Sequence, residues 1–550
     1  MTTSLPTLRR PALRGRASAR PPSALAAGPV IVVLGLLVGI GAAVPLAYLI
    51  WRAWELGWTE TWAVLSTGRT WDLLVSTLVL AVSVTAAAIA ISLPVAWLTT
   101  RTDLPLRRFW AVVTALPLAI PTYVGSFAMI GALGPRGMLQ GWLEPLGVEQ
   151  LPSIYGFGGA FVVLTLFTYP YMLLTVRAAY RRLDPSLEEV SRTLGRGTFS
   201  TFTRVVLPQL RTSIIAGSLL VSLYCLSDFG AVSMLRYDTF TRAIYTQYRG
   251  ALNRGSAAVL GLVLVALTIA VVSAEQRFRS REQVHRLHGG GARVARTISL
   301  GRWRWLAFTA CALLTFVALV VPLGVIGFWL VRGLRAGDDV IPALSLIRNS
   351  LTVSLLGAAA TVAMAWPVAV LTVRHPGRLA RVVERLSWSG HALPGLVVAL
   401  ALVFVGAQRL PWAYQTIGML VFAYVVLFLP QAIGALRASL LQVTPTLEEA
   451  SLLLGAGRIA TFARIVVPLT RPGIASGAAL VFLTCMKELP ATLLLSPTGF
   501  GSLATRVWTA SAEAFFGRAA GAALALVLLS SLPMTVLVLR DAEPRTPPAD

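Results

Sequence analysis

The sequence predicts an all-α membrane protein in which twelve transmembrane helices form two parallel six-helix repeats. Three observations support this prediction. The chain is 56% hydrophobic and only 13% charged, it contains a series of long apolar stretches, and its two halves share a motif. Soluble domains usually carry about 25% charged residues, so this composition argues against a water-soluble fold.

Ten apolar stretches contain no Asp, Glu, Lys or Arg and are long enough to cross a hydrocarbon layer of about 30 Å. Two more stretches have the length but are interrupted. Asp228 interrupts 212–235. Lys487 and Glu488 interrupt 472–505. We expect every stretch to be helical, because a helix satisfies its own backbone in lipid. The ten uninterrupted spans are 29–51, 73–100, 109–135, 150–176, 255–274, 305–331, 349–373, 386–408, 410–436 and 519–539.

The formal net charge of +24 would suggest a nucleic-acid partner if the arginines formed one face. They lie instead in short groups between apolar stretches, so no nucleic-acid partner is expected. With the N-terminus inside, alternate connections place 33 of the 47 Lys and Arg residues on the cytoplasmic side. Only the connection 236–254, with four arginines outside, weakens this pattern. The distribution predicts that both termini are cytoplasmic.

An internal repeat is the most informative feature. Without gaps, an offset of 260 residues aligns 185–217 with 445–477, and 16 of the 33 positions are identical. At a slightly different offset a Pro-Val-Ala tripeptide and a following arginine recur, so that Arg374 matches Arg101. Six spans separate the copies, which predicts parallel halves related by a pseudo-twofold axis along the membrane normal.

Each copy of the repeated loop predicts a helix, a glycine turn and a second helix on the membrane surface. The acidic pairs lie near the positive end of the first helix dipole, and the glycines suit its C-terminal cap. A mere surface connection is the alternative, but a connection would not need the same residues twice. The candidate loop residues are Glu188, Glu189, Gly195, Pro208, Glu448, Glu449, Gly455 and Pro468.

This loop resembles that of the inner-membrane permeases of bacterial ABC importers, which carries a Glu-Ala-Ala, Gly, Leu-Pro pattern. Here the first copy reads Glu-Glu-Val at 188–190, Gly195 and Leu-Pro at 207–208. The second reads Glu-Glu-Ala, then Gly455, then Val-Pro at 467–468. The first alanine is Glu in both copies, and Val190 and Val467 also depart from the pattern.

The resemblance covers nearly the whole chain and implies two fused permease halves of the type I importer fold. It implies a coupling helix in each loop that docks on an ATPase, with two copies of a cytoplasmic ABC ATPase as partners. It further implies a periplasmic substrate-binding protein, a location in the bacterial inner membrane among its lipids, and transport by alternating access.

A second resemblance concerns the cargo. The segments 226–232 with 236–241, and 487–493 with 497–500, look like those of the fused permeases of ferric iron importers. Permeases for thiamine, polyamines and phosphonate are relatives with similar loops, so these cargoes stay open alternatives.

The chain contains no phosphate-binding loop of the Gly-x-x-x-x-Gly-Lys-Ser/Thr type, because its single lysine is Lys487. We therefore expect a transport permease and not an enzyme. No cofactor is expected on this chain, and ATP and magnesium are expected on the partner subunits.

Two carboxylates interrupt predicted spans at matching positions, since Asp228 and Glu488 are 260 residues apart. A carboxylate within a membrane span is costly and usually faces a cavity, an ion path or a partner. Our hypothesis is that the two face each other across the pseudo-axis and line the translocation pathway, where their oxygens suit a hard cation. In the alternatives, both lie at the outer interface, or Glu488 pairs with Lys487. No metal site is assigned.

Two other classes of protein remain to be distinguished from this one. An ion-coupled secondary transporter can also have twelve spans in two parallel halves, and a membrane scaffold would transport nothing. The predicted organisation is a basic cytoplasmic tail 1–28, a first half 29–274 with coupling loop 183–211, a cytoplasmic linker 275–304, a second half 305–540 with coupling loop 443–471, and a tail 541–550.

Overall fold

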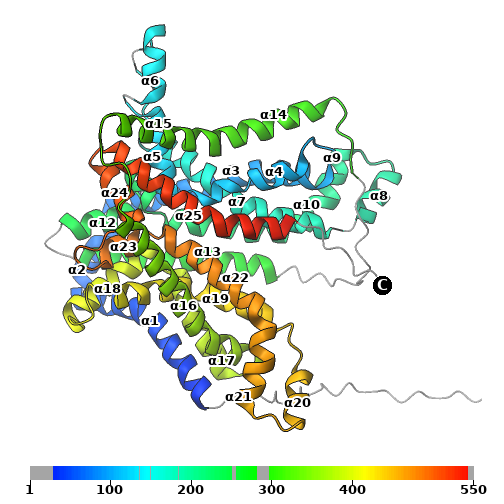
Figure 1. Ribbon diagram of the computed structural model, residues 1–550, viewed down its shortest axis with the longest axis vertical. Coiled ribbons are helices and arrows are strands. Elements are labelled where there is room, and N and C mark those ends of the chain that lie inside the picture. The colour runs from blue at the N-terminus through cyan, green and yellow to red at the C-terminus, as the bar shows by residue number, and fades with distance from the viewer. Residues whose placement is uncertain are drawn as a thin grey trace, which may run out of the picture.

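The computed structural model describes residues 29–135, 137–148, 150–183, 185–250, 255–280 and 297–542. In these ranges the chain forms helices in two bundles that diverge toward one end of the molecule (Figure 1). The predicted tail 1–28, residues 281–296 of the predicted linker and residues 543–550 of the predicted second tail lie outside the described residues.

The first half consists of helices that begin and end close to the predicted apolar stretches. Short 3-10 helices, η1 (Leu116–Ala119) and η2 (Glu144–Leu146), and a π-helix, η3 (Phe202–Val206), interrupt the α-helices. The α-helices are α1 (Pro29–Leu56), α2 (Trp58–Ser66), α3 (Gly68–Arg101), α4 (Arg107–Val113), α5 (Thr122–Leu133), α6 (Met138–Leu143), α7 (Phe157–Arg182), α8 (Pro185–Thr193), α9 (Thr198–Thr201), α10 (Leu207–Ser227), α11 (Gly230–Met234), α12 (Phe240–Gly250) and α13 (Gly255–Ser280).

The second half follows the same plan. Its interruptions are the π-helices η4 (Phe316–Val320) and η6 (Phe462–Val466) and the 3-10 helix η5 (Ser389–Ala392). Its α-helices are α14 (Trp303–Thr315), α15 (Val321–Arg335), α16 (Leu344–Arg374), α17 (Arg378–Trp388), α18 (Gly395–Arg409), α19 (Ile417–Leu440), α20 (Pro445–Leu453), α21 (Arg458–Thr461), α22 (Val467–Lys487), α23 (Pro490–Leu495), α24 (Leu503–Ala512) and α25 (Phe516–Ala542).

Nine continuous helices in the described part of the chain are long and apolar enough to cross a membrane. A tenth candidate, the predicted span 109–135, is broken: Arg107–Ala119 and Thr122–Leu146 meet at 94°. The remaining two predicted spans correspond to shorter apolar helices, Gly395–Arg409 and Phe516–Ser531. The predicted number of twelve therefore includes one bent and two short apolar segments.

The long helices of the two halves repeat the same packing. Helix α3 packs against α7 as α16 packs against α19, and α10 packs against α7 as α22 packs against α19. Glycine permits the second contact in both halves. A Cβ on Gly217 would lie 2.6 Å from the Met172 sulfur, and one on Gly477 would lie 3.2 Å from the Ala435 Cβ. Small residues allow such close approach of membrane helices.

The offset between the repeats changes within each half. Arg101 and Arg374 are 273 residues apart, whereas Phe157 and Ile417, which begin α7 and α19, are 260 apart. The first half carries α6 and η2 between α5 and α7, and the connection from α18 to α19 has no such helices. This added segment, whose α6 projects from the top of Figure 1, explains the shift.

The first helix of each half packs on the other half. Helix α1 contacts α16, α17 and α18. A Cβ on Gly35 would lie 3.3 Å from Leu371, and one on Gly39 would lie 3.3 Å from the Leu386 Cβ. Conversely, α14 packs against the first half, where the rings of Trp110 and Phe308 meet edge to face with centroids 5.2 Å apart. The two bundles are therefore interlocked.

The end of the linker is fastened to the first half beside α3. The Ile298 N–H donates to the Arg101 carbonyl at 2.8 Å, and the Asp103 N–H donates to the Ile298 carbonyl at 3.1 Å. The Asp103 carboxylate accepts from the Leu300 N–H at 2.8 Å and from the Ser299 hydroxyl at 3.2 Å. These bonds, the one from Leu300 first, hold the pKa of Asp103 below its usual value. We call this contact the linker clasp.

The interlocking predicts a specific disulfide. Cysteines replacing Gly39 and Leu386 would place their Cβ atoms close to the usual disulfide separation of about 3.8 Å. We expect the double variant to cross-link on mild oxidation. After cleavage at a protease site engineered into 281–296, the two fragments should migrate together on a non-reducing gel and separate on reduction.

The control pairs Gly39→Cys with Arg381→Cys. Arg381 is exposed on α17, and five residues at about 100° each turn it well away from Leu386. This pair should give no joined fragments. Equal cross-linking of both pairs, or of neither, would contradict the interlocked arrangement.

Candidate functional site

The two repeated loops form matching elbows at the same end of the molecule, beyond the ends of α3 and α7 and of α16 and α19 (Figure 1). We call α8, α9 and η3 the first elbow, and α20, α21 and η6 the second elbow. The predicted second helix of each loop is present. It continues through a π-helix into the following span, so Pro208 and Pro468 lie in the first turn of α10 and α22.

The predicted glycine caps are present in both elbows. Gly195 has φ +78° and Gly455 has φ +84°, the left-handed region that side chains rarely adopt. The two bonds of a Schellman cap close the first turn, from Gly195 N–H to the Arg192 carbonyl and from Arg196 N–H to the Ser191 carbonyl. The second elbow repeats both bonds. The sharp turn between the two helices of each elbow therefore depends on glycine.

The acidic pairs of the two elbows divide between inside and outside. Glu188 turns inward toward Arg101, with 3.5 Å between Oε1 and Nη2. Glu448 is fully buried and pairs with Arg374 at 2.8 Å. Burial raises the pKa of Glu448 above its usual value, while the Arg374 guanidinium lowers it. Glu189 is exposed, whereas Glu449 is half-buried.

Each elbow also presents bare apolar side chains, which the sequence analysis did not single out as a set. In the second elbow Leu453 is 89% exposed and Leu454 is 88% exposed. These positions lie beyond the ends of the long apolar helices. Exposed large apolar side chains that gather outside a core often mark a protein contact. These side chains are Leu187, Val190, Leu194 and Phe199 in the first elbow and Leu447, Leu453, Leu454 and Ile459 in the second.

Asp228 ends α10 and caps the short helix that follows. Its Oδ1 accepts from the Ala231 N–H at 2.9 Å and the Val232 N–H at 3.4 Å. Its Oδ2 accepts from the Thr122 hydroxyl at 2.5 Å. The side chain is thus buried, and both of its oxygens accept hydrogen bonds, from the first turn of α11 and from Thr122 of α5.

In the second half, Glu488 likewise accepts a hydrogen bond from the short helix that follows it. Its Oε1 accepts from the Ala491 N–H at 3.1 Å, which caps α23. The longer side chain fits because Gly395, at the position matching Thr122, has no side chain: a Cβ there would lie 2.8 Å from Oε1. A small cavity of about 10 Å³ lies beside Glu488, lined also by Ser350 and Tyr424.

No hydrogen bond or ion pair joins Asp228 and Glu488, although both are among the described residues. Tyr123 is a neighbour of both segments. Its Cβ lies against Gly230, beside Asp228, and its phenol lies within electrostatic range of Glu488. Its hydroxyl is buried and has no hydrogen-bond partner in the described part of the chain.

Lys487 does not pair with Glu488. Its ammonium donates to the Leu118 carbonyl at 2.9 Å, in the break of the first half's bent span. Ser530 of α25 donates to the next carbonyl, that of Ala119, at 3.2 Å. Two donors from the second half therefore satisfy carbonyls that the break in the first half leaves free.

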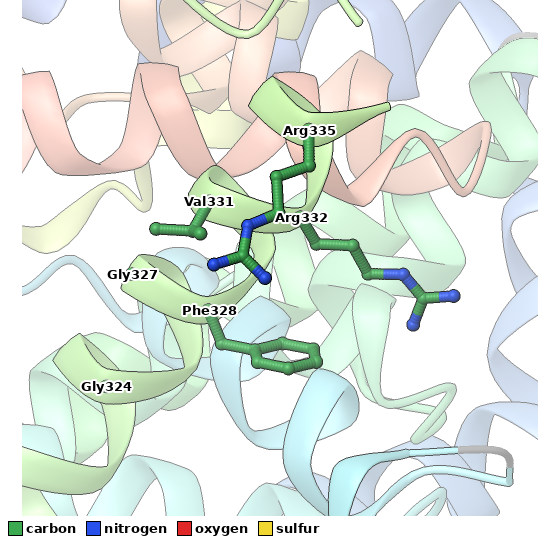
Figure 2. A pocket seen from close by; sticks show the side chains of 6 residues that line it. All are labelled: Gly324, Gly327, Phe328, Val331, Arg332 and Arg335. Carbon is green, nitrogen blue, oxygen red and sulfur yellow. The ribbon is translucent and has the colours of Figure 1, made fainter. Parts of the chain in front are cut away.

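Neither a metal cluster nor the groove along α15 coincides with these residues. Within the described ranges, no group of three or more His, Cys, Asp or Glu side chains is placed to hold a metal ion. A groove of about 630 Å³ runs along α15 alone (Figure 2). It is lined by Gly324, Gly327, Phe328, Val331, Arg332 and Arg335 and contains no residue of either elbow.

Comparison with known protein families identifies the architecture. Residues 88–283 and 357–540 each match the model of the binding-protein-dependent transport system inner membrane component. The chain belongs to this family. Each match includes one elbow and the carboxylate that follows it, so the permease has two copies of the family domain in one polypeptide.

Individual relatives of the permease cover different lengths of it. It is 36% identical to the Fe(3+)-transport system permease protein FbpB 2 of Haemophilus influenzae, over 92% of this chain and 97% of the relative. It is 23% identical to the ferric transport system permease protein FbpB of Actinobacillus pleuropneumoniae, over 70% and 58%. The sulfate transport system permease protein CysT of Escherichia coli is 28% identical over 34% of this chain and 67% of the relative.

Membership settles the general nature of the protein. It is a membrane-embedded transport permease of an ABC importer and not an enzyme. As the inner-membrane component of a binding-protein-dependent system, it works with a substrate-binding protein and an ATPase.

The glycine caps predict a difference between two neighbouring glycines of the second elbow. At Gly455, alanine would be forced into the left-handed region at a cost of about 1 kcal/mol, or about fivefold in the population of the ordered elbow. Gly457 has φ −67° and open space around it, so alanine is tolerated there. We expect Gly455→Ala to lower ATP-dependent uptake several-fold and Gly457→Ala to leave it unchanged. Equal effects of the two substitutions would contradict the role of the turn.

Proposed function

We propose that the permease imports ferric iron that a periplasmic binding protein delivers. The observation that carries this proposal is the likeness, along almost the full length of both chains, to a permease named for Fe(3+) transport. Carboxylate and phenol oxygens at Asp228, Glu488 and Tyr123 are donors that a hard cation prefers, which supports the same cargo.

In this proposal, the elbows are the docking sites of two ATPase copies. Their bare apolar side chains would fill grooves on the ATPase surface, and the acidic residue Glu189 would lie on the outer side of the contact. ATP and magnesium belong to those partners, and this chain binds no cofactor. Both termini and both elbows would then be cytoplasmic, in agreement with 33 of 47 basic residues on that side.

Transport in this scheme is alternating access. The two elbows lie far apart in Figure 1, so a closing pair of ATPases would draw them together and rotate the interlocked bundles. The bundles would open toward the binding protein on the other side. Phe229, next to Asp228, packs on Trp508 of the second half, and Tyr123 of the first half lies near Glu488. The pathway between the halves would therefore pass beside these residues.

The test is uptake into vesicles that contain the permease, its ATPase and an iron-loaded binding protein. We expect ferric ion to enter only when ATP is present. Thiamine, polyamines and phosphonate should neither enter nor compete. Uptake driven by an ion gradient without ATP would instead identify a secondary transporter, and uptake of one of the other solutes would move the cargo assignment to that solute.

The same vesicles test the docking sites. Replacing Leu453 and Leu454 by Ser should lower the amount of ATPase that co-purifies at least tenfold, because the two side chains are bare in the permease. The control replaces Ile341 and Leu344, which are 71% and 79% exposed at the opposite end of α16. This second pair should leave co-purification unchanged.

The central carboxylates predict a separate result. Asp228→Asn and Glu488→Gln keep an oxygen that can cap α11 and α23, but they remove the charge. We expect the double variant to insert normally and bind the ATPase, while ferric uptake falls at least tenfold. Uptake equal to that of the unchanged protein would show that the carboxylates are structural caps only.

A further inference from the structure

The same three-part contact occurs at the foot of both elbows. Arg101 ends α3 and Arg374 ends α16, and both side chains are almost fully buried, with 5% and 6% exposed. Arg101 donates to the Leu183 carbonyl at 3.2 Å and faces Glu188. Each guanidinium therefore joins three elements: its own helix, the end of the next long helix and the first turn of the elbow.

The second half repeats the contact with different surroundings. Arg374 donates to the Val443 carbonyl at 2.9 Å and pairs with Glu448 at 2.8 Å. The two arginines, like the two glutamates and the two carbonyls, occupy matching positions of the repeat. Two independent copies of one arrangement in a single chain argue that the arrangement serves both halves.

Hydrogen bonds within each elbow join its two short helices, so that the elbow can move as a unit. The Ser191 and Thr201 hydroxyls lie 3.0 Å apart in the first elbow. The Ser451 and Thr461 hydroxyls lie 2.9 Å apart in the second. These bonds join the two short helices of each elbow across the glycine turn. They do not attach the elbow to α3 or α16, and the arginine supplies that attachment.

Arginine suits this position better than lysine. In both halves the contacts to the carbonyl and to the carboxylate are made by Nη2, whose two N–H groups are held in the plane of the guanidinium. A guanidinium is also less strongly hydrated than an ammonium, which makes it the better cation to bury. The carbonyls of Leu183 and Val443 lie just beyond the ends of α7 and α19, where the chain turns into the elbow, and an arginine donates to each of them. A buried guanidinium between two acceptors is also hard to displace without loss of both.

From this geometry we infer that Arg101 and Arg374 are positioning residues that transmit the movement of each elbow to α3 and α16. The inference rests on the proposed docking of ATPases at the elbows. Helix α3 packs on α7 and α10, and α16 packs on α19 and α22. A pull on an elbow held by its arginine thus reaches three spans of that half, whereas a pull on a detached elbow reaches only the helices joined to it through the chain.

The two attachments are unequal. Glu448 is completely buried at 2.8 Å from its arginine, whereas the Glu188 side chain keeps 14% exposure at 3.5 Å. Loss of Arg374 should therefore impair transport more than loss of Arg101.

The experiment compares Arg101→Gln, Arg374→Gln and the double variant with the unchanged permease, in the complete complex with ATPase and binding protein. Three quantities are measured: ATPase co-purification, ATP hydrolysis and cargo uptake. We expect co-purification and hydrolysis to stay within twofold. Uptake should fall two- to threefold for Arg101→Gln, at least fivefold for Arg374→Gln and at least tenfold for both.

Two further variants and one control complete the test. Arg374→Lys retains the charge but not the fork of donors, and its uptake should lie between that of Arg374→Gln and that of the unchanged protein. If Arg374→Gln does not insert, Glu448→Gln breaks the ion pair and leaves the bond to the Val443 carbonyl, and it should show the same excess of hydrolysis over uptake. Arg378→Gln, at an exposed arginine just beyond α16, is the matched control and should change nothing.

The outcomes separate this inference from the proposed function. Normal uptake in the double variant would overturn the inference while the proposed function stands. Loss of co-purification together with uptake would also overturn it, because the arginines would then shape the docking surface. Absence of ATP-driven uptake in the unchanged complex would overturn the proposed function itself and remove the basis of the inference.

Discussion

The structure depends on one constraint: in lipid, every backbone N–H and carbonyl needs a partner within the protein. Long helices meet this constraint by themselves, but the central spans of both halves are broken. At each break a charged or polar side chain replaces the missing helical bond. Asp228 and Glu488 accept from the first N–H groups of α11 and α23, and Lys487 donates to the Leu118 carbonyl. The charged residues within the spans thus lie where the helices stop, and any contact with cargo would compete with these bonds.

The same constraint acts where the spans end and the elbows begin. There the carbonyls of Leu183 and Val443 face protein rather than water, and an arginine satisfies each of them. Because that arginine also faces a glutamate of the elbow, the group that completes one helix also fixes the position of the next element. One arginine side chain therefore both satisfies the carbonyl at the end of a helix and connects the elbow to the bundle. Burying a cation is costly, and the carbonyl and the carboxylate that each arginine meets offset part of that cost.

Features encoded locally in the sequence were predictable. The repeated loops, their helices and the positive-φ glycines follow from short motifs, and the structure contains them. Contacts between distant parts of the chain were not predictable in the same way. The match of Arg101 with Arg374 was visible, but the partner of Arg101 lies 87 residues further along the chain. The packing of α1 on the other half leaves no local signal either, since a lipid-facing helix and a helix buried against a distant neighbour have the same apolar composition.

The two halves differ in the sizes of two neighbouring buried side chains, and the two differences offset each other. Where the first half has Thr122 and the shorter Asp228, the second has Gly395 and the longer Glu488, so that the volume lost at one position is filled from the other. Lys487 has no such counterpart, because serine occupies its matching position in the first half. The second half therefore holds the broken span of the first through the Lys487 ammonium. Fusion of two halves in one chain permits this divergence, since each copy can change without changing the other.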